Sequence, residues 1–266
     1  MTKKNALEEG RRLLEAGQPE EALALLADLV DKQDAAIGVP ALDMAARAAH
    51  ALGRLEEAGT FFRRLRDRLK ALFGERHPHV AAAQENMARL AQEQGRPDEA
   101  LTLGREALSM LLEARGSDHE DVARARLNLS THWYALKHYD EAEQEVREAM
   151  RIWEARDGRR SRHVATCLNN LGRLNEERGE LRKGVQLHAE AASIRREVLG
   201  DDPETAFSLG NLGVAQLVVG DFQDAFLSLG QALTCYERLG LQDSPDALAY
   251  RTNLDICLEM MAQHQA

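Results

Sequence analysis

Aromatic residues make up only 5% of this 266-residue sequence, and no apolar run approaches the length of a membrane span. No segment reads as a β-strand, so a glycine-rich phosphate-binding loop between a strand and a helix is not expected either. The charged N-terminal segment, residues 1–17, is not followed by the apolar stretch of a signal peptide. We therefore expect a cytoplasmic protein that does not contact membranes.

Cysteine is also scarce. The three cysteines, Cys167, Cys235 and Cys257, form no Cys-x-x-Cys pair and are odd in number, which favours reduced and mostly buried thiols over a disulfide framework. The formal net charge of −10 favours solubility and argues against a general preference for nucleic acid. We expect no nucleic-acid partner.

Residues with the spacing of a metal or catalytic site are lacking as well. His77 and His79 flank Pro78 in a loop without further ligands nearby in the sequence, so a metal site is not expected. Ser130 and His132 lie two residues apart on a predicted helix and face apart, so they do not form a nucleophile–base pair. The sequence predicts a protein that is not an enzyme and needs no cofactor.

Alanine, leucine, glutamate and arginine dominate the sequence, and they favour helices because they lose little side-chain freedom there. The segment 164–200 reads as two helices joined by a tight turn at residues 178–180. Leu168, Leu171 and Gly172 lie on one face of the first helix, by steps of three and four residues. A single hairpin cannot bury this face alone, so neighbouring copies are needed.

The copies are visible as positions that recur at a nearly constant interval. Glycines expected to close hairpins stand 42 residues apart, at Gly74, Gly116, Gly158 and Gly200. Small residues of the second helix recur at steps of 36 to 42, at Ala22, Ala58, Ala100, Ala142, Gly184 and Ala225. Asparagines of the first helix keep the same step, at Asn86, Asn128, Asn170, Asn211 and Asn253. Several residue types that share one period indicate a repeat protein.

We predict an all-α fold, a right-handed superhelical solenoid of antiparallel helix hairpins that forms one domain over residues 1–266. The predicted repeats are 3–38, 39–80, 81–122, 123–164, 165–205 and 206–247, followed by a capping helix at 248–264. Asp255 of that helix takes the place of a small residue, such as Gly172 or Gly213, in the earlier copies. A charge at this position predicts a solvent-facing cap.

The hairpins resemble tetratricopeptide repeats. The large–small pairs of that family are present as Met87-Ala88, Leu129-Ser130, Leu171-Gly172 and Leu212-Gly213. The step of 42 departs from the usual period of about 34 and is similar to the long repeats of kinesin light chains, as are the residues 168–171 and 77–80. The resemblance covers residues 40–240. It is specific for architecture and weak for function, because the repeat serves many functions.

In such a solenoid the first helices line an inner groove, and the recurring asparagines would face it: Asn86, Asn128, Asn170, Asn211 and Asn253. An amide both donates and accepts hydrogen bonds, so a row of amides suits the backbone of an extended peptide. The resemblance implies the same role, because peptide-binding members of the family use asparagines at this position. The alternative is that each asparagine bonds a neighbouring helix and only supports the solenoid.

Two further groups of residues extend this prediction. Arg89, Arg124 and Arg173 would make part of the groove cationic and favour an acidic ligand or a C-terminal carboxylate, unless nearby glutamates, at Glu85, Glu93, Glu176 and Glu177, neutralise them. Apolar residues of the late groove would form an anchor site, unless the last helix covers them: Phe207, Val214, Leu217, Val218, Ile256 and Met260. The basic clusters at 63–70 and 156–162 are interpreted as solvated charge.

The predicted function is a non-enzymatic protein–protein interaction module that binds an extended peptide or partner segment with an acidic part and an apolar anchor. Two alternatives stay open at this point. The chain could be a structural scaffold that self-assembles through its ends or convex faces, or a peptide-responsive regulator that acts through a partner chain. The sequence does not identify the ligand, the pathway or the oligomeric state.

Overall fold

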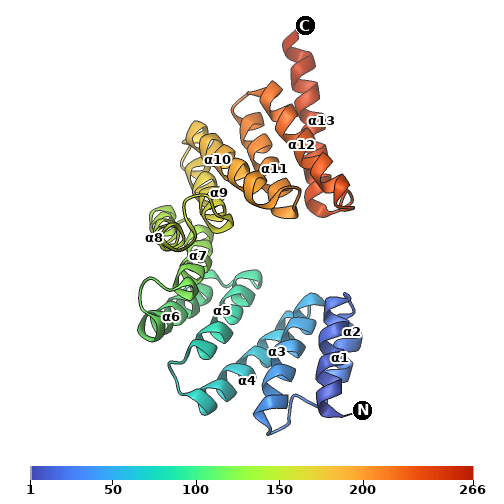
Figure 1. Ribbon diagram of the computed structural model, residues 1–266, viewed down its shortest axis with the longest axis vertical. Coiled ribbons are helices and arrows are strands. Elements are labelled where there is room, and N and C mark those ends of the chain that lie inside the picture. The colour runs from blue at the N-terminus through green and yellow to red at the C-terminus, as the bar shows by residue number, and fades with distance from the viewer. Residues whose placement is uncertain (1, 266) are drawn as a thin grey trace. The chain divides into compact units, whose positions relative to one another are not determined.

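The computed structural model describes residues 2–265, which form thirteen α-helices joined by short loops and contain no strand (Figure 1). The helices are α1 (Lys3–Glu15), α2 (Pro19–Leu26), α3 (Ala35–Ala51), α4 (Leu55–Phe73), α5 (Pro78–Glu93), α6 (Pro97–Arg115), α7 (Glu120–Ala135), α8 (Tyr139–Asp157), α9 (Arg162–Glu177), α10 (Leu181–Leu199), α11 (Pro203–Val218), α12 (Phe222–Arg238) and α13 (Pro245–Gln265). The all-α prediction is confirmed.

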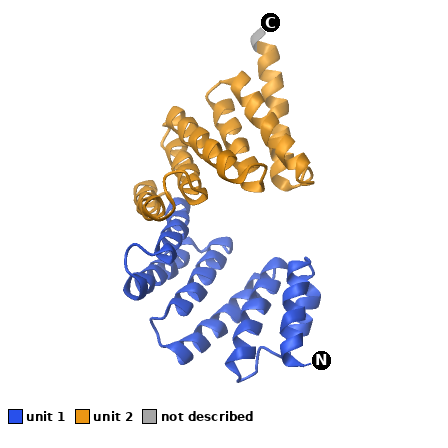
Figure 2. Cartoon of the chain, viewed as in Figure 1, with its two compact units in different colours: residues 1–136 blue, residues 137–266 orange. Residues whose placement is uncertain are grey.

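The chain forms two compact units, Met1–Leu136 and Lys137–Ala266 (Figure 2). The first unit contains α1 to α7 and the second contains α8 to α13. Within them, consecutive helices such as α5 and α6, α9 and α10, and α11 and α12 pack extensively against each other. The chain therefore uses helix hairpins as its building unit.

The helix boundaries follow from proline and glycine. Pro19, Pro78 and Pro97 each occupy the first turn of a helix, where a missing N–H has no helical partner to lose. Gly116 ends α6 with a φ of 80°, a conformation that glycine adopts without the steric penalty of a Cβ atom. Because the glycines recur with the repeat, the hairpins end at regular positions.

The core combines many alanines with large aliphatic and aromatic side chains. The recurring alanines Ala22, Ala58, Ala100, Ala142 and Ala225 are fully buried, so paired helices approach closely. Phe62 and Leu111 of the first unit and Ile194 and Leu229 of the second are also buried, and each such side chain contributes about 1.5–3 kcal/mol through burial. Cys167, Cys235 and Cys257 are buried free thiols, as predicted.

The start of the second hairpin differs from the prediction. The second predicted repeat begins at residue 39, whereas its first helix, α3, begins at Ala35 and contains Pro40 in its interior. Asp34 caps this helix, since its side chain accepts a hydrogen bond from the backbone N–H of Ala36. The cap allows an additional turn to form ahead of the proline, although proline disfavours helix in the preceding residue.

Lys137, between α7 and α8, has a φ of 61°, in a turn where the other hairpins have Gly17, Gly53, Gly95, Gly179 and Gly220. A left-handed backbone costs a non-glycine residue about 1–2 kcal/mol, whereas glycine loses about 0.5–1 kcal/mol more entropy on folding. We expect Lys137→Gly to raise the free energy of unfolding by about 0.5–1 kcal/mol, measured by urea denaturation. The reverse change at an equivalent turn, Gly95→Lys, should lower it, and a stability loss in Lys137→Gly would contradict this account.

Candidate functional site

A pocket of about 540 Å³ lies between α5 and α7 of the first unit. It is lined by Ala82, Glu85, Asn86, Arg89, Gln92, Glu93, Arg124, Asn128, Thr131 and His132. Asn86, Arg89 and Glu93 follow one another on α5 by steps of three and four residues, which places them on a single helix face. The structure thus brings four of the predicted site residues together: Asn86, Arg89, Arg124 and Asn128.

Glu85 joins the two helices of this pocket. Its side chain is almost completely buried and accepts a hydrogen bond from Arg124 Nη1 at 2.8 Å and another from Asn128 Nδ2 at 2.9 Å. Burial disfavours the charge of Arg124, but Glu85 and Asp121 more than offset it, so the pKa of Arg124 is raised. The alternatives stated for these two residues therefore apply: a glutamate neutralises the charge of Arg124, and the amide of Asn128 bonds a neighbouring helix.

Asn86 and Arg89 behave differently. Within residues 2–265, neither side chain has a hydrogen-bond or ion-pair partner. Glu93, which was a candidate partner for Arg89, lies 2.5 Å from Nε2 of His50 instead. The pocket therefore presents one half-buried amide and one exposed guanidinium that are available to a ligand.

Gln92 and His132 also line the pocket, and neither was a predicted site residue. Nδ1 of His132 lies 3.3 Å from Oε1 of Gln92, and burial lowers the pKa of His132, which favours the neutral ring. His132 fits because Gly104 lies opposite, where a Cβ atom would lie 3.1 Å from the ring. Helical spacing could have placed both residues in the pocket, because His132 follows Asn128 by four residues and Gln92 follows Arg89 by three.

The asparagines of the second unit differ in their hydrogen bonding. Asn170 is half-buried and has no hydrogen-bond partner in the described part of the chain. Asn211 accepts a hydrogen bond from the Tyr250 hydroxyl at 3.1 Å, and Asn253 donates to the backbone carbonyl of Ala249 on its own helix at 2.9 Å. Asn170 thus resembles Asn86, whereas the amides of Asn211 and Asn253 already bond within the unit.

The apolar residues of the late groove are partly exposed. Phe207 is 39% exposed and Val218 is 61% exposed, and their spacing places them on the same face of α11. Val214 packs against the core cluster that contains Tyr236 and Tyr250. Ile256 is also exposed, at 44%, whereas Val214 contributes to the core, and the anchor role of the exposed residues stays a prediction.

Several residues of the two basic clusters form ion pairs within the chain. Arg64 lies against Asp31 and Lys70 lies 2.6 Å from Glu75, and Arg160 and Arg162 pair with Glu197 and Glu204. Exposed pairs of this kind contribute little to stability. They reduce the free positive charge at 63–70 and 156–162.

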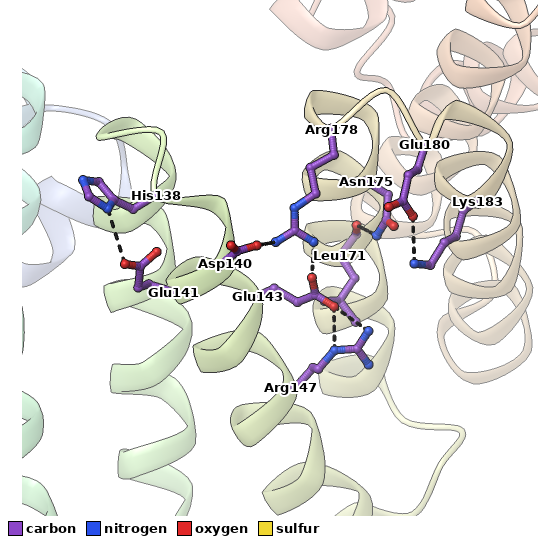
Figure 3. A network of polar contacts seen from close by, with 10 residues as sticks. All are labelled: His138, Asp140, Glu141, Glu143, Arg147, Leu171, Asn175, Arg178, Glu180 and Lys183. Carbon is purple, nitrogen blue, oxygen red and sulfur yellow. Dashed lines mark hydrogen bonds and ion pairs between the residues drawn. The ribbon is translucent and has the colours of Figure 1, made fainter.

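A related network joins α8 to the end of α9 (Figure 3). Arg178 donates to Asp140 at 2.5 Å and also to Glu143, which accepts a second interaction from Arg147. Burial alone would raise the pKa of Glu143, but the hydrogen bonds from Arg178 and Arg147 lower it. With its charges paired, this junction holds the two helices together and offers no cationic site.

His77 has a structural role. Its Nδ1 accepts a hydrogen bond from the backbone N–H of His79 at 3.2 Å and so caps α5. Among residues 2–265, no three His, Cys, Asp or Glu side chains are grouped as metal ligands. In the same part of the chain, no helix has the length and apolarity needed to cross a membrane.

Comparison with family models identifies the repeat. One model described as tetratricopeptide repeat matches residues 41–113 and 163–238, and a second model of the same description matches residues 7–71 and 86–157. A search of curated proteins finds no match.

Several solved structures are similar in fold. BtubC (BKLC) from P. vanneervenii has a TM-score of 0.67 at 24% identity, over 90% of this chain and 89% of that one. A putative kinesin light chain from Podosopora anserina with nearly identical TPR-like repeats has a TM-score of 0.62 at 20% identity, over 76% and 96%. The apo form of RapI has a TM-score of 0.68 at 11% identity, over 99% and 100%. At these identities the likeness concerns the fold.

Proposed function

This chain belongs to the tetratricopeptide repeat family, and from that premise we propose that it binds an extended segment of a partner protein in the pocket between α5 and α7. Members of this family are generally protein-interaction modules. The proposal assigns the pocket as the ligand site and a peptide with an acidic side chain as the ligand.

The main support is the pair of unpartnered polar groups, Asn86 and Arg89, in a pocket whose other charges are already paired. The side-chain amide of Asn86 can donate to a peptide carbonyl and accept from the next peptide N–H. Asn128 contributes its Oδ1 as an acceptor, because its Nδ2 is bonded to Glu85. A peptide unit between α5 and α7 would then be bound without regard to its side chain.

The charges favour an acidic residue next to that peptide unit. Glu85 pairs with Arg124, and Glu93 lies against His50. Arg89 is the cation of this pocket that has no counter-charge within the described residues. A carboxylate of the ligand can accept two parallel hydrogen bonds from its guanidinium, which would add specificity to the backbone contacts.

In the second unit, Asn170 is the further proposed backbone contact, with Arg173 as an exposed neighbour and Phe207 and Val218 as apolar contacts. Asn211 and Asn253 are left out of the proposed contacts because their amides bond Tyr250 and Ala249. The proposal therefore keeps the predicted residue types and leaves out the asparagines whose amides are already bonded.

The test begins with peptides selected from a display library of short random sequences and measures their affinity by fluorescence anisotropy. Asn86→Ala should weaken binding by about 1–2 kcal/mol, because one or two hydrogen bonds in a desolvated site are lost. Arg89→Gln should weaken acidic peptides by about 2 kcal/mol and neutral ones less.

Asn253→Ala is the matched control, because it removes the same side chain at the equivalent repeat position, where the amide bonds its own helix. It should leave the affinity unchanged. If Asn86→Ala and Arg89→Gln both bind every selected peptide as tightly as the unaltered chain, with intact helical content by circular dichroism, the pocket is not the ligand site.

A further inference from the structure

The second unit contains another hollow, which lies between α10 and α12, the second helices of two successive hairpins. Its volume is about 410 Å³. It is lined by Arg196, Asp201, Phe226, Leu227, Gly230, Gln231, Thr234, Cys235 and Arg238. These residues belong to the second helices of two successive hairpins and to the loop that begins at Gly200. This surface is therefore separate from the faces of the first helices, where the peptide contacts are proposed.

Comparison of equivalent repeat positions shows that the α12 surface differs from its counterparts. Leu227 is 57% exposed, and residues at this position in the four preceding hairpins are polar: Thr60, Thr102, Gln144 and Gln186. Phe226, beside it, is also exposed. The sixth hairpin thus presents a large apolar side chain at Leu227 where the four preceding hairpins have polar ones, and Phe226 is exposed beside it.

Gly230 is the second difference. It lies in the interior of α12, where glycine weakens a helix, and the equivalent residues are Arg63, Arg105, Arg147 and Ala189. The buried helix glycines of this chain, such as Gly172 and Gly213, have a neighbouring side chain where a Cβ atom would stand, but Gly230 has no atom within 4 Å of that position. Packing within the chain therefore does not explain this glycine. It leaves the backbone of α12 open to a close approach from outside.

The charges at the rim indicate what kind of partner fits. Arg196 donates to the neutral side-chain carbonyl of Gln231 at 3.1 Å and has no carboxylate partner among the described residues. Arg238 is paired with Asp201 at 2.9 Å. The hollow thus combines an apolar surface with one uncompensated cation, which complements a ligand that carries both an apolar side chain and a carboxylate.

We propose that the groove between α10 and α12 binds an amphipathic helix of a partner protein. An aliphatic or aromatic side chain of that helix packs over Gly230 against Phe226 and Leu227, and an acidic side chain about one turn away pairs with Arg196. A groove between two helices accepts the side-chain ridge of a third helix. The absence of a side chain at Gly230 lets the helix approach closely enough to bury the apolar contact.

The test uses a phage-displayed library of helical peptides on an alanine-rich scaffold, randomised along one face. We expect selected peptides to carry an apolar residue and an Asp or Glu one turn apart. Leu227→Gln introduces the side chain found at the two preceding equivalent positions and should weaken binding at least about tenfold, since it removes a central apolar contact. Arg196→Gln should weaken the acidic peptides about fivefold and leave non-acidic peptides unaffected.

Gly230→Ala separates a binding defect from a folding defect. Its methyl group meets no atom of the chain, so the variant should melt at a higher temperature than the unaltered protein and yet bind the selected helices more weakly. Leu72→Gln, at a similarly exposed leucine of the first unit (46% exposed), should leave the affinity unchanged. Asn86→Ala should also have no effect, which distinguishes this site from the proposed peptide pocket.

Three results would overturn the proposal. The library could yield no helix that binds the chain, or the selected helices could bind Leu227→Gln and Gly230→Ala as tightly as the unaltered protein. The third is self-association: if sedimentation of the pure protein shows concentration-dependent growth that Leu227→Gln abolishes, a second copy of the chain occupies the groove instead of a partner helix.

Discussion

Replacing Gly210 by alanine should lower the free energy of unfolding of the second unit by about 3 kcal/mol. A Cβ atom at Gly210 would lie 2.5 Å from Cε1 of Tyr250 and closer still to Cζ and Cε2. The Tyr250 ring is buried in the core, and its hydroxyl donates towards Asn211 and the Phe207 carbonyl. Overpacking costs about 1–3 kcal/mol, and displacement of the ring would also break hydrogen bonds worth about 1 kcal/mol each.

Urea denaturation monitored by circular dichroism measures this effect. Gly230→Ala is the matched control, because the same substitution in the neighbouring helix meets open space and should raise stability by up to about 1 kcal/mol. Tyr250→Ser introduces the residue type of the equivalent Ser208 and removes the clash. In a double-mutant cycle, Gly210→Ala should therefore cost much less in the Tyr250→Ser background. Equal effects of the two alanine substitutions would disprove the packing argument.

Arg195→Ala should destabilise the second unit by a similar amount, about 3 kcal/mol. Arg195 is only 5% exposed, and it occupies the position of Leu69, Leu111 and Trp153 in the preceding repeats. Its Nη1 donates to the Glu204 carbonyl and to Ser208 Oγ, both at 2.8 Å, and its Nη2 donates to Thr166 Oγ1 at 3.0 Å. Burial lowers the pKa of Arg195, opposed by Glu204, but an arginine stays protonated in proteins.

Truncation removes these hydrogen bonds and leaves a cavity between α9, α10 and α11. The effect lies at the lower end of the range of about 3–5 kcal/mol for a broken buried ion pair, because Glu204 is partly exposed and keeps Arg162 as a second partner. Arg195→Leu refills the space with the side chain of the equivalent repeats and should cost less than Arg195→Ala.

Arg182→Ala provides the comparison in urea denaturation. It removes an exposed ion pair with Asp221, and the expected loss is less than about 1 kcal/mol. If Arg195→Ala and Arg182→Ala lose the same small amount, the buried network around Arg195 does not support the unit.

Much of the local structure could be predicted because it depends on residues close together in the sequence. The recurring alanines are buried, and the recurring glycines end helices or close turns. The faces that carry Asn86 and Arg89, and Arg124 and Asn128, were predicted from helical spacing alone. In the structure these four residues line one pocket, and their role in binding stays a prediction.

The partners of the predicted residues could not be obtained in this way. Glu85 was a candidate partner for several arginines, and the structure pairs it with Arg124, 39 residues later. Glu93 was another, and it contacts His50, 43 residues earlier. Both pairings depend on how neighbouring helices pack. The sequence offers several candidate carboxylates for each arginine. Helical spacing therefore predicts the face but not the partner.

By itself, the sequence determined that this protein is an all-α repeat protein and which residues share each helix face, because helix periodicity and turn chemistry act over a few residues. Only the tertiary structure decided which of those residues remain free to bind. Asn170 and Asn211 occupy equivalent positions in two successive repeats, yet within residues 2–265 only the side chain of Asn211 is hydrogen-bonded. Its partner is Tyr250 of α13, and at the position of Tyr250 the earlier copies have small residues such as Cys167. The availability of a side chain depends on contacts between helices, which a local pattern does not contain.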